Sequence, residues 1–158
     1  MDNAVPASET PPLADGRHFT VEEMKCHDGT PYPAEWGDRL ATLFGVMDII
    51  RDAWGGPLTV VSGYRSPAHN QALIEQDEAN GSHQVASGSQ HIEGRAADLR
   101  TANGPQDVPQ LMRVINQLYS DGKIPALGGI GDYPTSNWVH IDVRPQAPLG
   151  HVARWRGV

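Results

Sequence analysis

The sequence contains a single cysteine, Cys26, in 158 residues. A disulfide within the chain and a cysteine-rich structural zinc site are therefore excluded. Lys and Arg number 12 against 19 Asp and Glu, the formal net charge is -7, and the basic residues form no cluster. This balance argues against nucleic acids and anionic membrane surfaces as partners. No apolar run approaches membrane-spanning length, so we expect no membrane insertion.

The chain also lacks familiar hydrolase motifs and a secretory signal. It has no Gly-x-Ser-x-Gly pattern, which argues against a serine nucleophile, and no His-Glu-x-x-His pattern, which argues against a thermolysin-like protease. Residues 1–15 have neither a basic region nor an apolar stretch and do not resemble a signal peptide. We expect residues 1–17 to form a disordered leader and residues 18–158 to form one domain.

Hydrophobic periodicity indicates helices and short strands in succession. We expect helices over residues 34–54, 67–78 and 108–119, and strands over residues 58–61, 95–100, 128–131 and 138–143. The first helix carries an apolar stripe at Leu40, Leu43, Phe44, Met47, Ile50 and Trp54. A shorter helix over residues 19–24 has Thr20 as its cap and Glu23 at the capping-box position. This mixture predicts an α+β domain.

Asp98 is the most informative polar residue. It lies in the apolar run of residues 96–99, where a strand would bury its carboxylate at a cost that a cation or strong donors must offset. Glycine at position 94 disfavours a helix there. A turn at Gly94 would instead bring His91 back towards Asp98. His91, Asp98 and His140 would then supply the two imidazoles and one carboxylate of a catalytic zinc site.

Each of these residues also has a simpler explanation. His91 alone could be a surface or hydrogen-bonded histidine, and Asp98 alone could be the buried partner of Arg65 or Arg95. Taken together, the spacing and the apolar context favour the metal. We therefore predict one Zn²⁺ bound by His91, Asp98 and His140.

The last predicted strand separates its side chains into two faces. Because alternate residues of a strand share a face, Val139, Ile141 and Val143 would face the core, and Trp138, His140, Asp142 and Arg144 would face the other way. An imidazole, a carboxylate and a guanidinium beside an aromatic ring suit a reaction site better than a core.

Other candidate metal ligands are weaker. Cys26, His27 and Asp28 are consecutive in a turn-rich segment, and three adjacent residues do not converge easily on one ion. We expect a loop with a partly buried thiol there. His69, early in the second helix, could serve either in packing or at the rim of the pocket.

Three ordered motifs resemble those of the zinc D-alanyl-D-alanine carboxypeptidase family, which also includes D,D-dipeptidases and phage L-alanyl-D-glutamate endolysins. They are Ser-Gly-Tyr-Arg-Ser-Pro at residues 62–67, Ser-x-His-x-x-Gly-x-Ala-x-Asp at residues 89–98, and Trp-Val-His-Ile-Asp at residues 138–142. The glycine-rich residues 128–134 and the terminal Arg154-Trp155 are similar to the small single-domain branch. The resemblance extends from about Phe19 to Trp155.

The resemblance implies a small antiparallel sheet beneath the metal, with His91, Asp98 and His140 as zinc ligands. It places Arg65 beside the substrate carbonyl or carboxylate and Ser89 in hydrogen bonds near the site. The implied substrate is a peptidoglycan stem peptide cleaved at a bond that involves a D-amino acid, by carboxypeptidase or endopeptidase action. We expect a monomer that acts on the bacterial cell wall, in the periplasm or outside the cell, after export by another route or phage-type release.

The general base departs from the commoner family patterns. Many members have a glutamate three residues before the last ligand histidine, or a histidine two before it, and this chain has Asn137 and Trp138 there. The small branch has an aspartate two residues after that histidine, which predicts Asp142 as the base. The alternative is that Asp142 orients the His140 ring or pairs with Arg144.

The same face of the last strand also supplies the expected substrate groove. We expect Tyr133, Trp138 and Arg144 to line it together with Arg65 and Ser89. The missing glutamate or histidine leaves a rival function open, in which a zinc-stabilised domain of this fold binds a peptide or protein without cleaving it.

Overall fold

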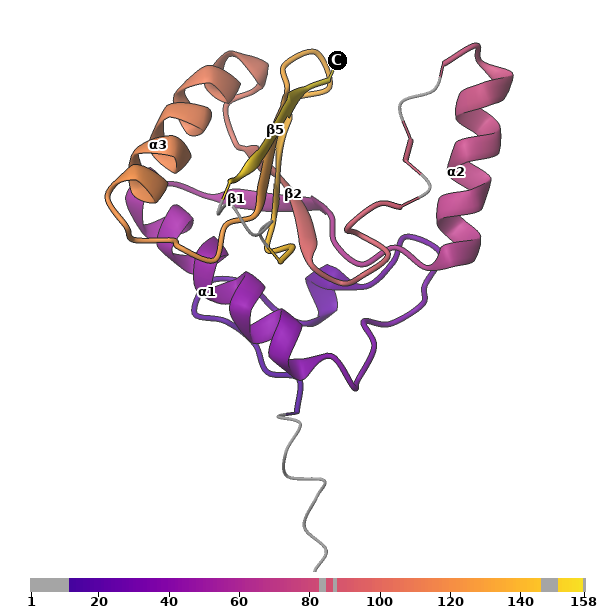
Figure 1. The fold of residues 1–158 in the computed structure, drawn as a ribbon, viewed down its shortest axis with the longest axis horizontal. Coiled ribbons are helices and arrows are strands. Elements are labelled where there is room, and N and C mark those ends of the chain that lie inside the picture. Colours follow the sequence, from indigo (N-terminus) through magenta and orange to yellow (C-terminus); the bar gives the residue numbers. More distant parts are fainter. Residues whose placement is uncertain (1–11, 83–84, 87, 146–150, 158) are drawn as a thin grey trace, which may run out of the picture.

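The computed structural model describes residues 12–82, 85–86, 88–145 and 151–157. In chain order these residues form α1 (Gly37–Trp54), β1 (Leu58–Ser62), α2 (Pro67–Ala79), β2 (Ala96–Thr101), α3 (Val108–Ser120), β3 (Gly129–Tyr133), β4 (Trp138–Asp142) and β5 (Ala153–Arg156). Short 3-10 helices occupy Glu22–Met24 and Pro105–Asp107. Figure 1 shows α1 and α3 together on one side of the sheet and α2 apart from them. The predicted α+β class is confirmed.

The strands form one sheet in the order β1-β2-β4-β3-β5. β2 pairs antiparallel with β1 and β4, and β3 pairs antiparallel with β4. β5 adds to the edge in parallel with β3, so the sheet is mixed and not wholly antiparallel as expected. This last pairing places residues 153–156 beside the glycine-rich β3 strand, a contact that hydrophobic periodicity does not reveal.

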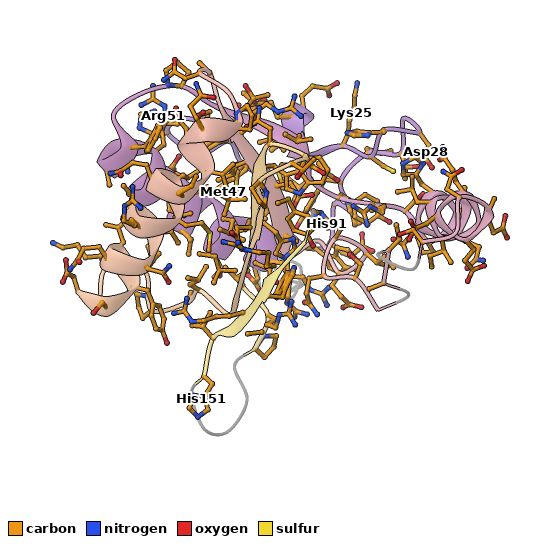
Figure 2. The ribbon with its side chains drawn as sticks, turned by 90° about the horizontal axis from the view of Figure 1, so that it is seen from above. Lys25, Asp28, Met47, Arg51, His91 and His151 are labelled. Atoms are coloured by element: carbon orange, nitrogen blue, oxygen red, sulfur yellow. The ribbon has the colours of Figure 1, made fainter. Side chains whose placement is uncertain are left out.

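The core lies between the sheet and helices α1 and α3. The predicted stripe of α1 is buried, with Met47 and Ile50 fully enclosed, and Figure 2 shows Met47 in the middle of the molecule. From the sheet, alternate residues of β2 and β4 enter the same core, namely Ala97, Leu99, Val139 and Ile141. The other face of these two strands is therefore free to carry polar chemistry.

The ends of the first elements follow local rules. The backbone N–H of Glu23 donates to Thr20 Oγ1 and the backbone N–H of Thr20 donates to Glu23 Oε1, which is the predicted capping box on a single 3-10 turn. Helix α1 begins at Gly37 and not at Ala34, because Trp36 has the non-helical torsions φ -103 and ψ 37. It ends at Trp54, and the following Gly55 has a left-handed φ of 78, which suits glycine.

Part of the expected leader contacts the domain. Leu13 packs against the core, and the backbone N–H groups of Arg17 and His18 donate to the buried carboxylate of Asp48. The boundary between a leader and the domain at residue 17 stays a prediction. Residues 1–11 lie outside the described part of the chain. Among the described helices, none combines the length and the apolarity that crossing a bilayer requires.

Truncating Met47 tests the core. We expect Met47→Ala to lower the free energy of unfolding by about 2–5 kcal/mol, because it leaves a cavity between α1 and the sheet. Thr42→Ala, an exposed change on the same helix, should stay within about 0.5 kcal/mol of the parent. Urea denaturation measures both, and equal effects of the two changes would contradict this core.

Candidate metal centre

The centre is built on one cross-strand pair. Asp98 of β2 lies directly opposite His140 of β4 in the antiparallel ladder, on the face turned away from the core. Residues that face each other in such a pair have close side chains. The Nδ1 atom of His140 lies 3.1 Å from Asp98 Oδ1, and both side chains are buried.

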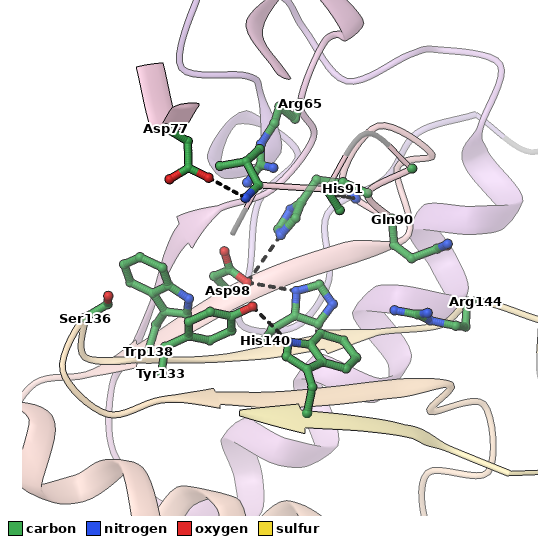
Figure 3. A pocket seen from close by; sticks show the side chains of 15 residues that line it. Arg65, Asp77, Gln90, His91, Asp98, Tyr133, Ser136, Trp138, His140 and Arg144 are labelled. Atoms are coloured by element: carbon green, nitrogen blue, oxygen red, sulfur yellow. Dashed lines mark hydrogen bonds and ion pairs between the residues drawn. The ribbon is translucent and has the colours of Figure 1, made fainter. Parts of the chain in front are cut away.

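His91 reaches the same carboxylate from a turn. Gly94 has a φ of 71 and its N–H donates to His91 O, so the predicted turn before β2 is present. The hydroxyl of Ser89 accepts the backbone N–H of His91. The His91 ring donates from Nδ1 to Gly63 O at 2.7 Å, and its Nε2 lies 3.3 Å from Asp98 Oδ1. Figure 3 shows both rings directed at Asp98.

The hydrogen bonds on the far side of each ring fix what faces Asp98. Gly63 O can only accept, so a neutral His91 ring carries its proton on Nδ1 and presents the Nε2 lone pair to the carboxylate. Likewise, the ring of His140 donates from Nε2 to Asp142 Oδ2 at 2.7 Å, which leaves the Nδ1 lone pair facing Asp98. Two neutral rings and a carboxylate would therefore repel one another unless a cation lay between them.

The donor set fits a divalent metal ion. The nitrogen and oxygen ligands of a tetrahedral zinc, at bonds of about 2.0–2.1 Å, lie roughly 3.3 Å apart. The two distances to Asp98 Oδ1, 3.1 and 3.3 Å, match this spacing. One ligand atom from each of His91, Asp98 and His140 lies within 4.8 Å of the others. Metal-binding histidines commonly have their second nitrogen held in this way.

The titration of the three groups follows from their burial and contacts. Burial lowers the pKa of His91, which keeps its ring neutral. Burial also opposes the charged form of His140, but hydrogen bonds to Asp142 and Asp98 outweigh it and raise the pKa of that ring. For Asp98, the burial penalty is outweighed by the two histidines, and its pKa is held well below the ordinary value. Without a metal, a proton on His140 therefore supplies part of the missing positive charge.

Asp142 lies behind His140. Its side chain is fully buried and binds the His140 ring, while Arg144 donates to it from Nε at 2.9 Å and from a terminal nitrogen at 2.7 Å. Burial alone would raise the pKa of Asp142, but the hydrogen bonds from Arg144 and His140 have the larger effect and lower it below its ordinary value, so the carboxylate is ionised. A Cβ at Gly129, its neighbour on β3, would lie 2.3 Å from Asp142 Oδ2, so glycine makes room for this carboxylate.

A cavity of about 560 Å³ opens over the three ligands. All five residues expected to bind substrate line this cavity, namely Arg65, Ser89, Tyr133, Trp138 and Arg144. Asp142 is not among the lining residues. The side nearest α2 is formed by Asp77, Val85, Ala86 and Gly88, which sequence reasoning did not identify, and β5 contributes Trp155.

The two arginines of the pocket differ in their charge balance. Arg144 forms a bidentate ion pair with Asp142, so its charge is largely committed. Arg65 donates to the neutral oxygens of Asn70 and Ser62, and no described carboxylate lies within ion-pair distance of it. Burial lowers the pKa of Arg65, but a guanidinium stays charged in proteins. Arg65 is thus the cation that can meet a charge on a bound molecule.

Trp155 closes the pocket beside His140. The two ring centroids lie 4.9 Å apart, and Trp155 Nε1 donates to Tyr133 Oη at 2.8 Å. The indole lies over Gly131, where an added Cβ would approach Trp155 Nε1 to 2.4 Å. The alternating glycines of β3 are the sequence feature from which a bulky group over this strand could have been predicted.

Two comparisons with known proteins bear on this site. The model of a protein family described as peptidoglycan L,D-endopeptidase MepK matches residues 40–155. A probable peptidoglycan L,D-endopeptidase MepK of Haemophilus influenzae is 35% identical over 101 residues, which make up 64% of this chain and 44% of that relative. The chain therefore spans less than half the length of this curated relative.

Asp142→Asn tests the role of the carboxylate behind His140. In metal-free protein, we expect the substitution to lower the pKa of the His140 ring, because an amide cannot stabilise imidazolium as a carboxylate does. Asp132→Asn on β3, which removes a carboxylate bound to Arg156, should leave that titration unchanged. NMR titration of the ring protons measures both, and an unshifted His140 in the Asp142 variant would contradict the contact.

Proposed function

This chain belongs to the family described as peptidoglycan L,D-endopeptidase MepK, and we propose that it hydrolyses a peptide bond of peptidoglycan with one Zn²⁺ held by His91, Asp98 and His140. The membership confirms the resemblance carried by the three sequence motifs. The observation that most supports the proposal is the pair of ring lone pairs directed at one buried carboxylate. That arrangement calls for a cation, and an open cavity lies above it.

A bound Zn²⁺ would supply Lewis acidity to a water molecule and to the scissile carbonyl. The residues of the chain then have separate tasks. Arg65, the pocket cation without a carboxylate partner among the described residues, stabilises the negative charge that develops on the carbonyl oxygen. Trp138 and Tyr133, whose rings pack 5.5 Å apart, offer a flat surface for the stem peptide. Ser89 holds the turn that carries His91.

We propose Asp142 as a positioning residue rather than the general base. Its oxygens are fully buried and bound to His140 and Arg144, so the ring of His140 separates it from the cavity. This is the alternative that the sequence left open, and it fits the usual role of a carboxylate bound to a metal-ligating histidine. Apart from the ligand Asp98, Asp77 is the carboxylate among the described lining residues. We assign the proton transfer between water and leaving amine to Asp77.

The proposed specificity is endopeptidase action at a bond between an L- and a D-residue. The name of the Haemophilus influenzae relative supports it, and so does the charge pattern of the cavity. Carboxypeptidase action would need a cation for the terminal carboxylate of the substrate in addition to the one near the carbonyl oxygen. Arg144 is already paired with Asp142, which leaves Arg65 for the carbonyl. We further propose that the chain acts as a monomer at the cell wall.

Digestion of purified muropeptides tests the proposed function. With zinc-loaded protein, we expect mass spectrometry to show cross-linked dimers converted to smaller fragments by cleavage within the peptide, and no product after chelation or in His140→Ala. Loss of only the C-terminal residue would instead indicate a carboxypeptidase. A protein that retains zinc and binds muropeptides without cleaving them would contradict the enzymatic function and favour the binding module.

The base assignment has its own test. We expect Asp77→Asn to retain zinc and lower turnover by about 10²–10⁴-fold, because it removes the proton acceptor while leaving the ligands in place. Glu78→Gln, an exposed change next to it on α2, is the matched control and should keep the parent rate. Equal rates for the two variants, with zinc content unchanged, would remove Asp77 from the mechanism.

A further inference from the structure

A second group of metal-binding side chains lies at the start of α2. Cys26 and Asp28 belong to the turn after the first 3-10 helix, and His69 lies in the first turn of α2. One ligand atom from each lies within 4.8 Å of the others. Figure 2 shows Asp28 beside α2, away from His91. The adjacent residues Cys26, His27 and Asp28 do not form this group together, because its third member is His69 of α2 and not His27.

The sulfur is held inside the protein. Cys26 is 1% exposed, and the backbone N–H of Ser66, the N-cap of α2, donates to its Sγ at 3.3 Å. The Ser66 hydroxyl lies 3.8 Å from the same sulfur. Hydrogen bonds from outside a metal site fix the orientation of its ligands. The thiol therefore has a fixed position facing Asp28 and His69.

The carboxylate is ionised and fixed as well. Asp28 Oδ1 accepts the backbone N–H of Thr30 at 2.9 Å, and Asp28 Oδ2 accepts the Ser66 hydroxyl at 2.7 Å. The Thr30 N–H foremost, with the Ser66 hydroxyl, holds the pKa of Asp28 well below its ordinary value. A carboxylate oxygen with one such bond still has a lone pair for a cation.

The imidazole completes the set. The His69 ring is half-buried, and its nitrogens have no hydrogen-bond partner in the part of the chain that the structure describes. Its edge meets the ring of His27, with centroids 6.1 Å apart. His27 in turn uses its Nε2 to bind Val61 O at 2.8 Å, so its ring is committed elsewhere. His69 is thus the ring that can turn towards Cys26 and Asp28.

A nucleophilic role for the thiol fits these contacts poorly. The sulfur is nearly inaccessible, and Asp28 binds Ser66 and Thr30 instead of orienting the His69 ring, as a catalytic triad would require. We propose that Cys26, Asp28 and His69 form a structural site for Zn²⁺. Thiolate, imidazole and carboxylate ligands all suit this borderline ion. They would occupy three positions of a tetrahedral site and leave the fourth to water, which is a more open arrangement than that of most structural zinc sites.

The site would connect the turn at residues 26–30 to α2 and to the end of β1. That end supplies Gly63 O, which holds the His91 ring, and Arg65, which lines the cavity. Helix α2 supplies Asn70, the partner of Arg65, and the lining residue Asp77. A metal bound here would therefore fix the wall of the cavity without touching substrate. The proposal is independent of the hydrolytic function.

Cobalt binding tests the site, because thiolate coordination gives a near-ultraviolet charge-transfer band that a His₂Asp centre lacks. On addition of Co²⁺ to metal-free protein, we expect this band in the parent chain and in His140→Ala, which damages only the first centre. We expect its loss in His69→Ala. Asp28→Asn, an exposed change, should weaken the band. These variants avoid changing the buried Cys26, whose substitution could disturb folding.

The outcomes separate this site from the first centre. Co²⁺ titration should saturate the charge-transfer band in His140→Ala, and Zn²⁺ should raise the melting temperature of that variant but not of the double variant His69→Ala/His140→Ala, which lacks a ligand at both centres. A parent protein without the band at saturating Co²⁺ would overturn the proposal. A band of equal intensity in His69→Ala would also overturn it, since sulfur would then bind the ion without the imidazole.

Discussion

The structure depends on one electrostatic constraint, which is the presence of two imidazole lone pairs and a buried carboxylate at a single point. The register of β2 against β4 brings Asp98 opposite His140, and the turn at Gly94 adds His91. Gly63 O and Asp142 then fix which nitrogen of each ring faces Asp98. Because neither neutral ring directs a donor at the Asp98 carboxylate, a cation is the natural partner of these three groups.

The end of β1 connects this constraint to the rest of the molecule. Residues 62–66 make four of these contacts. Ser62 accepts a hydrogen bond from the Arg65 guanidinium, and Gly63 O accepts one from the His91 ring. Ser66 caps α2 and donates its backbone N–H to the sulfur of Cys26. A Cβ at Gly63 would meet Met24 backbone at 2.8 Å, so the segment also packs tightly on the first 3-10 helix. The candidate metal centre and the proposed structural site thus share one short backbone segment.

Much of this arrangement follows from local sequence. The alternation in residues 138–144 predicted correctly which side chains enter the core and which share a face with His140. It could not predict the depth of Asp142, which depends on the space left by Gly129 across the strand. The parallel pairing of β5 with β3 and the meeting of Cys26 with His69 are contacts between distant segments. Periodicity reports the environment of one segment and not its partner, so these contacts required the fold.

The central claim is that His91, Asp98 and His140 bind one ion together. Anomalous diffraction from crystals of the zinc-saturated protein, recorded on both sides of the zinc absorption edge, tests it most directly. The account predicts a peak between Nε2 of His91, Nδ1 of His140 and the carboxylate of Asp98. Zinc-saturated crystals with no anomalous peak at that position would contradict it.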